Sequence, residues 1–308
     1  GLTGVTFGLI ASTTSSFWSA MALGPVLLGF ALLGALVLWQ GRARYPLIPA
    51  ASRRSRRFVG ACTVYFASYT AFAGTLYYVT LLYQNLEGWS PLRTGVSWLF
   101  MNIPFLLIAQ QAGRLAGRFD PRSVIVCGCM LGAIGVAILA SLTSRTPFPV
   151  AALGYLFAGA GFGTLVPAVT HVAMRDVPTD AAGAGSAVLN CSRQLGTATG
   201  LAMIGALGSF ACVQSWRASW GPNHNFGLLA SALISGRIDV LARALGDRAR
   251  APAEAAFLHG YHVALIGAVL CLVAAAIVAV CTFSRTRRDH PSTPSLVFSV
   301  EHSKENQR

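Results

Sequence analysis

One charged residue, Arg193, falls inside a long apolar segment of the sequence. Steps of three and four residues along a helix place polar neighbours on the same face as Arg193: Ser186, Asn190, Gln194 and Thr197. A guanidinium within a bilayer costs at least about 2.5–3.5 kcal/mol, so it is expected to face protein or a water-filled cavity. The alternative is that the side chain snorkels to nearby lipid headgroups. The polar neighbours on its face favour the cavity.

Weaker candidates for the same cavity lie on two other predicted helices. Tyr65 and Tyr69 belong to one helical stripe, and Asn102 and Gln110 lie within about 80° of each other on the next helix. Aromatic and amide groups that point into a pocket would bind flat, cationic, hydrophobic compounds. The alternative is interhelical hydrogen bonding, worth about 0.6 kcal/mol for each bond. The candidate substrate-cavity residues are Tyr65, Tyr69, Asn102, Gln110, Asn190, Arg193 and Gln194.

The acidic residues all lie in predicted loops or in the C-terminal tail. A proton-coupled pump needs a titratable group within the membrane, so we expect its proton carriers to precede Gly1. His259 and His262 lie three residues apart near Glu254, but no HExxH motif and no second ligand cluster accompany them. We therefore expect no metal, no cofactor and no catalytic residue. An intramembrane metalloenzyme is the least favoured hypothesis.

The composition indicates a protein that lies mostly in lipid. Of 308 residues, 54% are hydrophobic and 11% are charged, whereas soluble domains carry about 25% charged residues. This balance excludes a largely disordered chain, and seven scattered cysteines exclude a disulfide-stapled secreted domain. A membrane span needs about 20 apolar residues. The sequence predicts a partial span at Gly1–Ala11 and complete spans at 20–40, 59–83, 93–112, 123–143, 150–172, 184–211 and 261–283.

The first apolar run begins at Gly1 without an initiator methionine, a charged leader or a small-residue cleavage site. We interpret the chain as the C-terminal part of a longer protein. Its net charge is +13, and the arginines gather in alternate connections such as 41–57 and 113–122. Such loops face the cytoplasm, which predicts a multi-pass cell-membrane protein. A nucleic-acid partner would instead need a basic face on a soluble fold.

The long connection 212–260 contains leucines at near-helical spacing with arginines between them. It predicts a short amphipathic helix on the outer membrane interface, and the alternative is a poorly ordered connector. The tail 285–308 is polar and charged, so we expect it to be disordered and cytoplasmic.

Small residues recur every four positions on two predicted spans. Gly159, Gly163 and Pro167 lie on one, and Gly196 and Gly200 lie on the next. This spacing lets helices approach closely, and a proline frees one backbone bond. The pattern predicts either a contact that slides or bends during function or plain tight packing.

The joint pattern of these segments resembles the major facilitator superfamily. The residues that carry the resemblance are Gly159–Pro167 (GAGFGTLVP), Asn190 and Arg193–Gly196 (RQLG), with supporting pieces at Pro46–Pro49 and Tyr83–Gly95. More narrowly, the pattern resembles fourteen-span drug:proton antiporters of the EmrB/QacA type. The resemblance covers about residues 1–284.

The resemblance implies a division of the chain into three parts. Residues 1–57 would be a central helix pair, its first helix truncated, with a basic cytoplasmic linker. Residues 58–284 would be the C-terminal six-helix half, built from two inverted three-helix repeats and carrying the external loop 212–260. The tail 285–308 would follow.

The cytoplasmic loop 113–122 resembles the family's loop pattern G-x-L-x-D-R-x-G-x-R. Gly113, Arg118 and Arg122 match it, whereas Gly117 replaces the acidic residue and Asp120 replaces the glycine. In the family this loop has a charge-relay role. The two departures put that role in doubt for this chain.

The resemblance thus implies an all-α integral membrane protein that contributes to proton-coupled, alternating-access export of hydrophobic or cationic drugs. Its expected partners are a small-molecule substrate, protons and the lipid bilayer. The alternative is a truncated, transport-inactive chain that acts as a structural or partner subunit.

Overall fold

The computed structural model describes residues 27–28, 31, 55–220 and 226–283, without the side chains of 112–118 and 226–228. Most of the predicted spans at 1–11 and 20–40, the linker up to residue 54 and the tail 285–308 lie outside the described residues. The described part of the chain contains helices and no strand.

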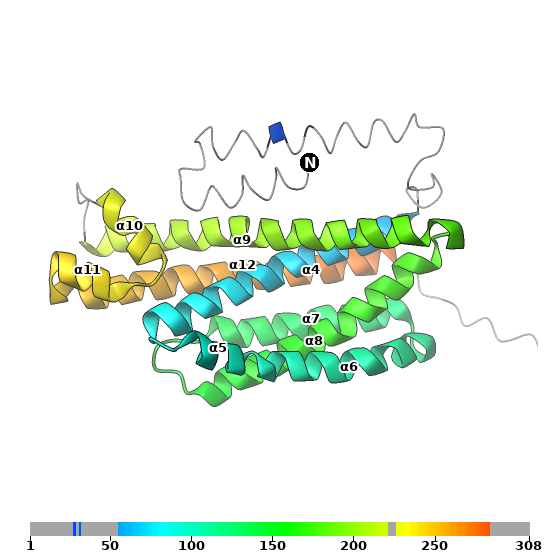
Figure 1. The fold of residues 1–308 in the computed structure, drawn as a ribbon, viewed down its shortest axis with the longest axis horizontal. Helices are drawn as coiled ribbons and strands as arrows, with labels where there is room; N and C mark the ends of the chain where they lie inside the picture. The colour runs from blue at the N-terminus through cyan, green and yellow to red at the C-terminus, as the bar shows by residue number, and fades with distance from the viewer. Residues whose placement is uncertain (1–26, 29–30, 32–54, 221–225, 284–308) are drawn as a thin grey trace, which may run out of the picture.

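Long helices dominate the described residues (Figure 1). They are α4 (Arg56–Leu81), which continues into the π-helical turn η1 (Leu82–Leu86), α5 (Pro91–Ser97), α6 (Leu99–Arg118), α7 (Pro121–Ala140), α8 (Phe148–Arg175), η2 (Thr179–Ala181), α9 (Ala182–Trp220), α10 (Phe226–Ile234), α11 (Ile238–Leu245), η3 (Asp247–Ala249) and α12 (Arg250–Thr282). Five segments within the described ranges are long and apolar enough to cross a membrane: Pro91–Gln111, Pro121–Ala140, Phe148–Arg175, Thr179–Trp220 and Asp247–Thr282. The prediction of an all-α membrane protein is confirmed.

Local sequence signals set where the helices begin. The Ser55 hydroxyl accepts from the Phe58 amide at 3.3 Å and caps α4, and Ser90 caps α5 in the same way through Arg93 at 3.2 Å. Prolines occupy the first turns of α5, α7 and α8, where a missing amide hydrogen does no harm. The predicted span 93–112 corresponds to α5 and α6, which meet at Trp98.

The segment 212–260 differs from the expected external loop with one amphipathic helix. Helix α9 continues to Trp220, α12 already begins at Arg250, and two short helices lie between them. Gly236 adopts a φ of 75°, which ends α10, and the Arg237 amide then bonds to the Ala232 carbonyl at 2.9 Å. Leu233 and Leu241 are fully buried (0% exposed), because α10 and α11 pack against the start of α12.

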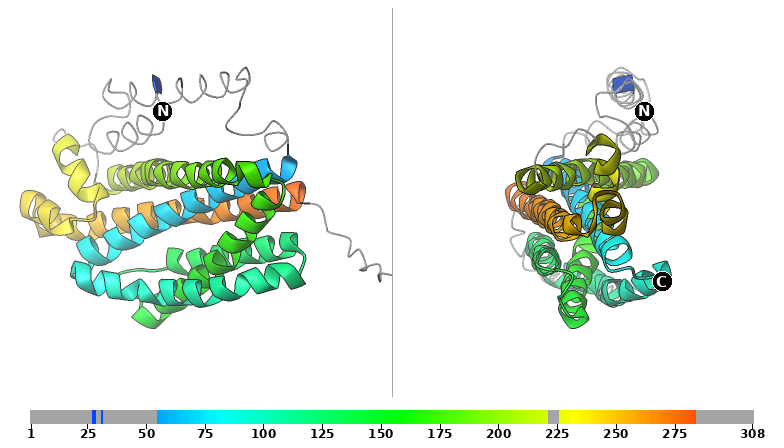
Figure 2. Two further views of the ribbon diagram at one scale, coloured as in Figure 1. Left: turned by 45° about the vertical axis from the view of Figure 1, so that its right-hand side comes forward. Right: turned by 90° about the vertical axis from the view of Figure 1, so that its left-hand side faces the viewer.

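The long helices form two layers. Helices α9, α4, α8 and α6 lie side by side in that order, while α12 packs behind α9 and α4, and α7 packs behind α8. The end-on view in Figure 2 shows α12 and α7 on the same side of the bundle. Helix α4 therefore lies at the centre, in contact with α9, α8 and α12.

Glycines bring the backbones of neighbouring helices into contact at several places in the described bundle. On α9, Gly196 and Gly200 lie against the carbonyls of Phe66 and Thr70 of α4, and the Thr70 hydroxyl donates to the Gly196 carbonyl at 3.1 Å.

On α8, Gly159 lies against the Met101 carbonyl of α6, and a Cβ added at Gly163 would come within 2.7 Å of the Phe105 carbonyl. Gly161 makes a similar contact with the backbone of Gly132 on α7. The four glycines predicted to permit close helix contacts all lie in such contacts.

We predict that Gly200→Ala lowers the stability of the protein while Gly205→Ala does not. A Cβ at Gly200 would collide with the Thr70 backbone, whereas no atom lies within 4 Å of one at Gly205. Overpacking of this kind costs about 1–3 kcal/mol, and a tolerated Gly→Ala change in a helix gains up to about 1 kcal/mol. Unfolding in detergent, followed by circular dichroism, measures both changes. Equal destabilisation by the two variants would contradict the close α4–α9 contact.

Candidate functional site

The side chain of Arg193 extends from α9 to α4. Its guanidinium carbon lies 5.6 Å from the centre of the Tyr69 ring, and its Nη2 donates to Asn190 Oδ1 at 2.7 Å. Arg193 and Asn190 are exposed, and Tyr69 is half-buried. We call these three residues, Tyr69, Asn190 and Arg193, the basic–aromatic cluster.

The cluster lies near the middle of the bundle. Tyr69 follows the first residue of α4, Arg56, by 13 positions in a helix of 26 residues. At 1.5 Å per residue this is about 20 Å from the start of the helix. Arg193 follows the first residue of α9, Ala182, by 11 positions, so it lies about 16 Å, or three turns, from the start of that helix.

The described residues place no carboxylate beside Arg193. Ion pairs among them join Arg57 to Asp176 and Arg250 to Asp239. The described acidic residues lie in connections, in short helices or in the first turns of α12: Glu87, Asp120, Asp176, Asp180, Asp239, Asp247 and Glu254. Within the described part of the chain, the Arg193 guanidinium thus contacts Asn190 and the π face of Tyr69.

Tyr65 supports the cluster from within the bundle. The side chain is 6% exposed, and its hydroxyl donates to the Val166 carbonyl of α8 at 2.8 Å and lies 2.5 Å from the Thr170 hydroxyl. Its ring meets the Tyr69 ring edge-on, with the centroids 5.8 Å apart. Tyr65 thus joins α4 to α8 and packs against Tyr69. Its hydroxyl group is hydrogen-bonded within the bundle and is not free to bind a substrate.

Two phenylalanines complete the support of Tyr69. Its ring lies 5.9 Å from the Phe72 ring and 6.4 Å from the Phe162 ring of α8, and these two rings are 5.0 Å apart. All of these contacts are edge-to-face, the arrangement that aromatic quadrupoles favour. They fix the ring plane that Arg193 approaches.

The other predicted cavity residues are not gathered at this cluster. Gln194 is exposed on α9 beside Arg193. Asn102 and Gln110 are exposed on α6, which packs against α8 and is separated from α4 and α9 by that helix. The Asn102 amide donates to the carbonyl of Trp98 in its own helix at 3.0 Å.

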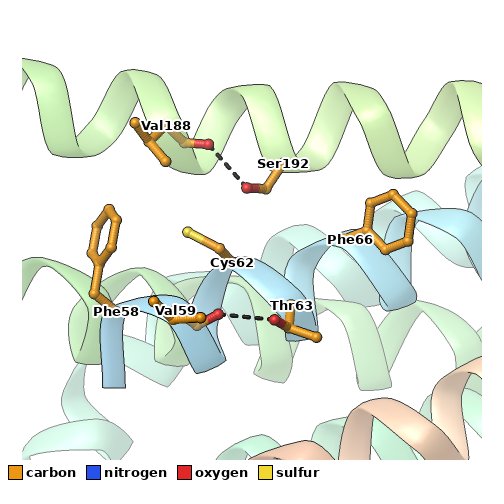
Figure 3. Close-up of a pocket in the computed structure, with 7 residues that line it drawn as sticks. All are labelled: Phe58, Val59, Cys62, Thr63, Phe66, Val188 and Ser192. Carbon is orange, nitrogen blue, oxygen red and sulfur yellow. Dashed lines mark hydrogen bonds between the residues drawn. The ribbon is translucent and has the colours of Figure 1, made fainter. Parts of the chain in front are cut away.

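A hollow that the sequence did not suggest lies between α4 and α9, near the ends where both helices begin (Figure 3). Its volume is about 360 Å³ and it is mostly apolar. Its lining residues are Phe58, Val59, Cys62, Thr63, Phe66, Val188 and Ser192. The sequence pattern that could have predicted this hollow is the spacing of Val59, Cys62 and Phe66, which follow one another in steps of three and four and so share one face of the helix. Consecutive helical residues point about 100° apart, so Ser192 faces this hollow while Arg193 reaches Tyr69.

The predicted loop residues lie at the end of the bundle where α7 begins. Arg122 lies beside Arg57 and Asp176 in a second hollow. Gly113 and Arg118 belong to the last turns of α6, and their side-chain surroundings lie outside the described residues. Pro167 lies within α8 one residue after Val166, whose carbonyl accepts the Tyr65 hydrogen bond.

Comparison with known proteins identifies relatives of this chain. The family model described as Major Facilitator Superfamily matches residues 1–201. The drug efflux pump JefA of Mycobacterium tuberculosis is 27% identical over 278 residues, which cover 83% of this chain and 53% of that protein.

Two Streptomyces proteins show the same kind of similarity. The puromycin resistance protein pur8 of Streptomyces alboniger is 26% identical over 287 residues, covering 91% of this chain and 51% of that protein. The methylenomycin A resistance protein of Streptomyces coelicolor is 28% identical over 210 residues, covering 67% and 43%. The chain thus spans about half the length of the relatives it matches.

Proposed function

This chain belongs to the Major Facilitator Superfamily of membrane transporters, and from that premise we propose that it forms the C-terminal portion of a proton-coupled drug exporter. A transporter moves its substrate without a chemical step, so the chain is not an enzyme. The proposed cargo is a hydrophobic, cationic small molecule. The proposed route is an alternating-access cavity between this bundle and a second bundle.

The observation that carries the proposal is the position of Arg193. Its charge is exposed about three turns into α9, beside Asn190 and the Tyr69 ring at the middle of α4. A charge at that depth is too costly to face lipid, so the polar face of α9 borders water, cargo or protein. Snorkelling to headgroups would draw the guanidinium toward the end of the helix, and its contact with Tyr69 at mid-bundle argues against this alternative.

The surroundings of the cluster suit a flat hydrophobic cargo. Tyr69 offers a ring whose plane is fixed by Tyr65, Phe72 and Phe162, and such rings pack against flat aromatic groups. Asn190 and Gln194 supply amides that orient polar atoms of the cargo. The names of the relatives, which refer to drug efflux and antibiotic resistance, support a drug-like substrate.

Proton coupling requires a titratable group in the cavity, and the described membrane helices place no carboxylate beside Arg193. We propose that the proton carrier is a carboxylate of the opposite bundle. A guanidinium within about 4–6 Å lowers the pKa of a carboxylate, and its withdrawal lets that pKa rise again. Movement of the two bundles would thereby change the proton affinity of the carrier as access alternates.

We predict that a cysteine at Asn190 reacts with a hydrophilic thiol reagent in membranes and that one at Ile277 does not. Both positions are exposed, Ile277 at 58%, but water borders the first and lipid borders the second under this proposal. Each variant is made after the seven natural cysteines have been replaced by serine, and labelling is followed by mass spectrometry. Asn190→Cys should react at least about tenfold faster, because a thiol ionises poorly in an apolar medium. Equal reaction rates of the two variants would show that the α9 face carrying Asn190 does not border the cavity.

We also predict that Arg193→Gln slows export of ethidium, a flat hydrophobic cation, by at least about tenfold, equivalent to about 1.4 kcal/mol in the barrier. The measurement is efflux of fluorescence from cells that express the complete protein containing this chain, with and without an uncoupler. Arg217→Gln is the matched control, since Arg217 is also exposed on α9 but lies in its last turn. Arg193→Lys tests whether charge alone suffices.

Efflux by Arg193→Gln within twofold of the wild type would reject the role of this charge. Efflux that the uncoupler does not affect would reject proton coupling. A complete protein that folds but exports no ethidium or related cation would favour the alternative of a structural or partner subunit.

A further inference from the structure

A second hollow, of about 510 Å³, lies at the end of the bundle where α4 and α7 begin and α8 and α12 end. We call it the basic hollow. Its lining residues are Ser55, Arg56, Arg57, Arg122, Asp176, Val280, Cys281, Thr282 and Phe283. A neighbouring cavity of about 30 Å³ shares Arg57, Arg122 and Phe283 with it and adds Asp120, His171 and Arg175.

The basic hollow carries more positive than negative charge. Its carboxylate, Asp176, is already engaged: Arg57 Nη1 lies 3.7 Å from Asp176 Oδ1, and the Ser55 hydroxyl donates to Asp176 Oδ2 at 2.7 Å. Among the residues that the structure describes, Arg56 and Arg122 have no ion-pair partner. Two helices begin here and two end here, so their end dipoles oppose one another. The positive potential therefore comes from the arginine side chains.

Two guanidinium groups on the wall of one hollow match a phosphate group. Arginine binds phosphate oxygens through a planar fork of N–H donors, and such charge-assisted hydrogen bonds are about twice as strong as neutral ones. Arg56 comes from α4 and Arg122 from α7, so residues from two helices bring both charges to the wall of the same hollow. The chemistry of the hollow points to a phosphate-bearing ligand.

An exposed apolar stripe on α12 leads away from the basic hollow. Val280 lines the hollow, and Ile277, Leu270 and Ile266 continue on the same side of the helix with exposed fractions of 58%, 62% and 54%. From Val280 to Ile266 the stripe is about 21 Å long, which exceeds the depth of one leaflet, about 15 Å of hydrocarbon. A ligand that fills both features has a phosphate head and a long apolar chain.

We propose that the basic hollow binds the headgroup phosphate of an anionic phospholipid whose acyl chain lies along the α12 stripe. The arginine-rich end is the cytoplasmic end in the predicted orientation, and anionic lipids concentrate in the cytoplasmic leaflet. The stripe distinguishes this ligand from free phosphate, which has no apolar part. The site lies at the ends of α4, α7, α8 and α12 and is separate from the basic–aromatic cluster.

The experiment compares retention of two lipids by the purified chain in neutral detergent, measured by native mass spectrometry. Dioleoyl phosphatidylglycerol and dioleoyl phosphatidylcholine have the same chains and a phosphate each, and differ in net charge. We expect at least fivefold greater retention of phosphatidylglycerol, and loss of that preference in Arg56→Gln/Arg122→Gln. The matched control is Arg145→Gln/Arg217→Gln, which removes two exposed arginines at the opposite end and should keep the preference.

Equal retention of the two lipids by the wild type would overturn the proposal, as would an equal loss in the control. Complete displacement of phosphatidylglycerol by millimolar inorganic phosphate would assign the hollow to free phosphate instead. If Arg56→Gln/Arg122→Gln fails to fold, the wild type still provides a test. Retention should fall when the salt concentration rises from 50 to 500 mM, since screening weakens interfacial charge pairs, and retention that is independent of salt would contradict the proposal.

Discussion

The arrangement of this bundle depends on backbone contact between α4 and α9. Helices in a bilayer gain little from hydrophobic burial against each other, so close packing of small residues and interhelical hydrogen bonds hold them together. Gly196 and Gly200 let α9 approach the carbonyls of Phe66 and Thr70, and the Thr70 hydroxyl adds a hydrogen bond across the contact. The contact fixes the rotation of α9 and thereby aims Arg193 at Tyr69.

A similar contact joins α8 to α6, and its glycines belong to α8. Gly159 and Gly163 of α8 lie against the carbonyls of Met101 and Phe105 of α6. The central helices α4 and α8 therefore each have one outer neighbour, α9 and α6, held by a four-residue spacing of small residues. In the two inverted three-helix repeats that we expect from the family resemblance, the pair α4–α9 would correspond to the pair α8–α6.

Much of the fold could be predicted from the sequence because lipid imposes simple rules. The length of apolar runs predicted the long described helices, and the four-residue glycine spacing predicted where backbones meet. The 212–260 segment differs because helix ends there depend on local signals, such as the left-handed conformation of Gly236, and on packing against α12. Averages of hydropathy along the sequence show neither where such helix ends fall nor which segments pack against α12.

The candidate site was predicted less completely. Arg193 was identifiable because a charge within an apolar run has few permitted environments. Helical periodicity placed Tyr65 and Tyr69 on one stripe but could not show that α8 lies beside Tyr65 and engages its hydroxyl. Periodicity also could not show that α8 separates Asn102 and Gln110 from α4. The order of helices in space decides these points, and it follows from contacts between distant segments.

The register of α4 against α9 is tested most directly by disulfide formation. Cys62 and Ser192 line the same hollow (Figure 3), whereas Arg193 points toward Tyr69. In a protein whose other natural cysteines are replaced by serine, Ser192→Cys should form a disulfide with Cys62 under mild oxidation, and Arg193→Cys should not. Cross-linking through position 193 in place of position 192 would show that α9 is rotated and that Arg193 does not face the proposed cavity.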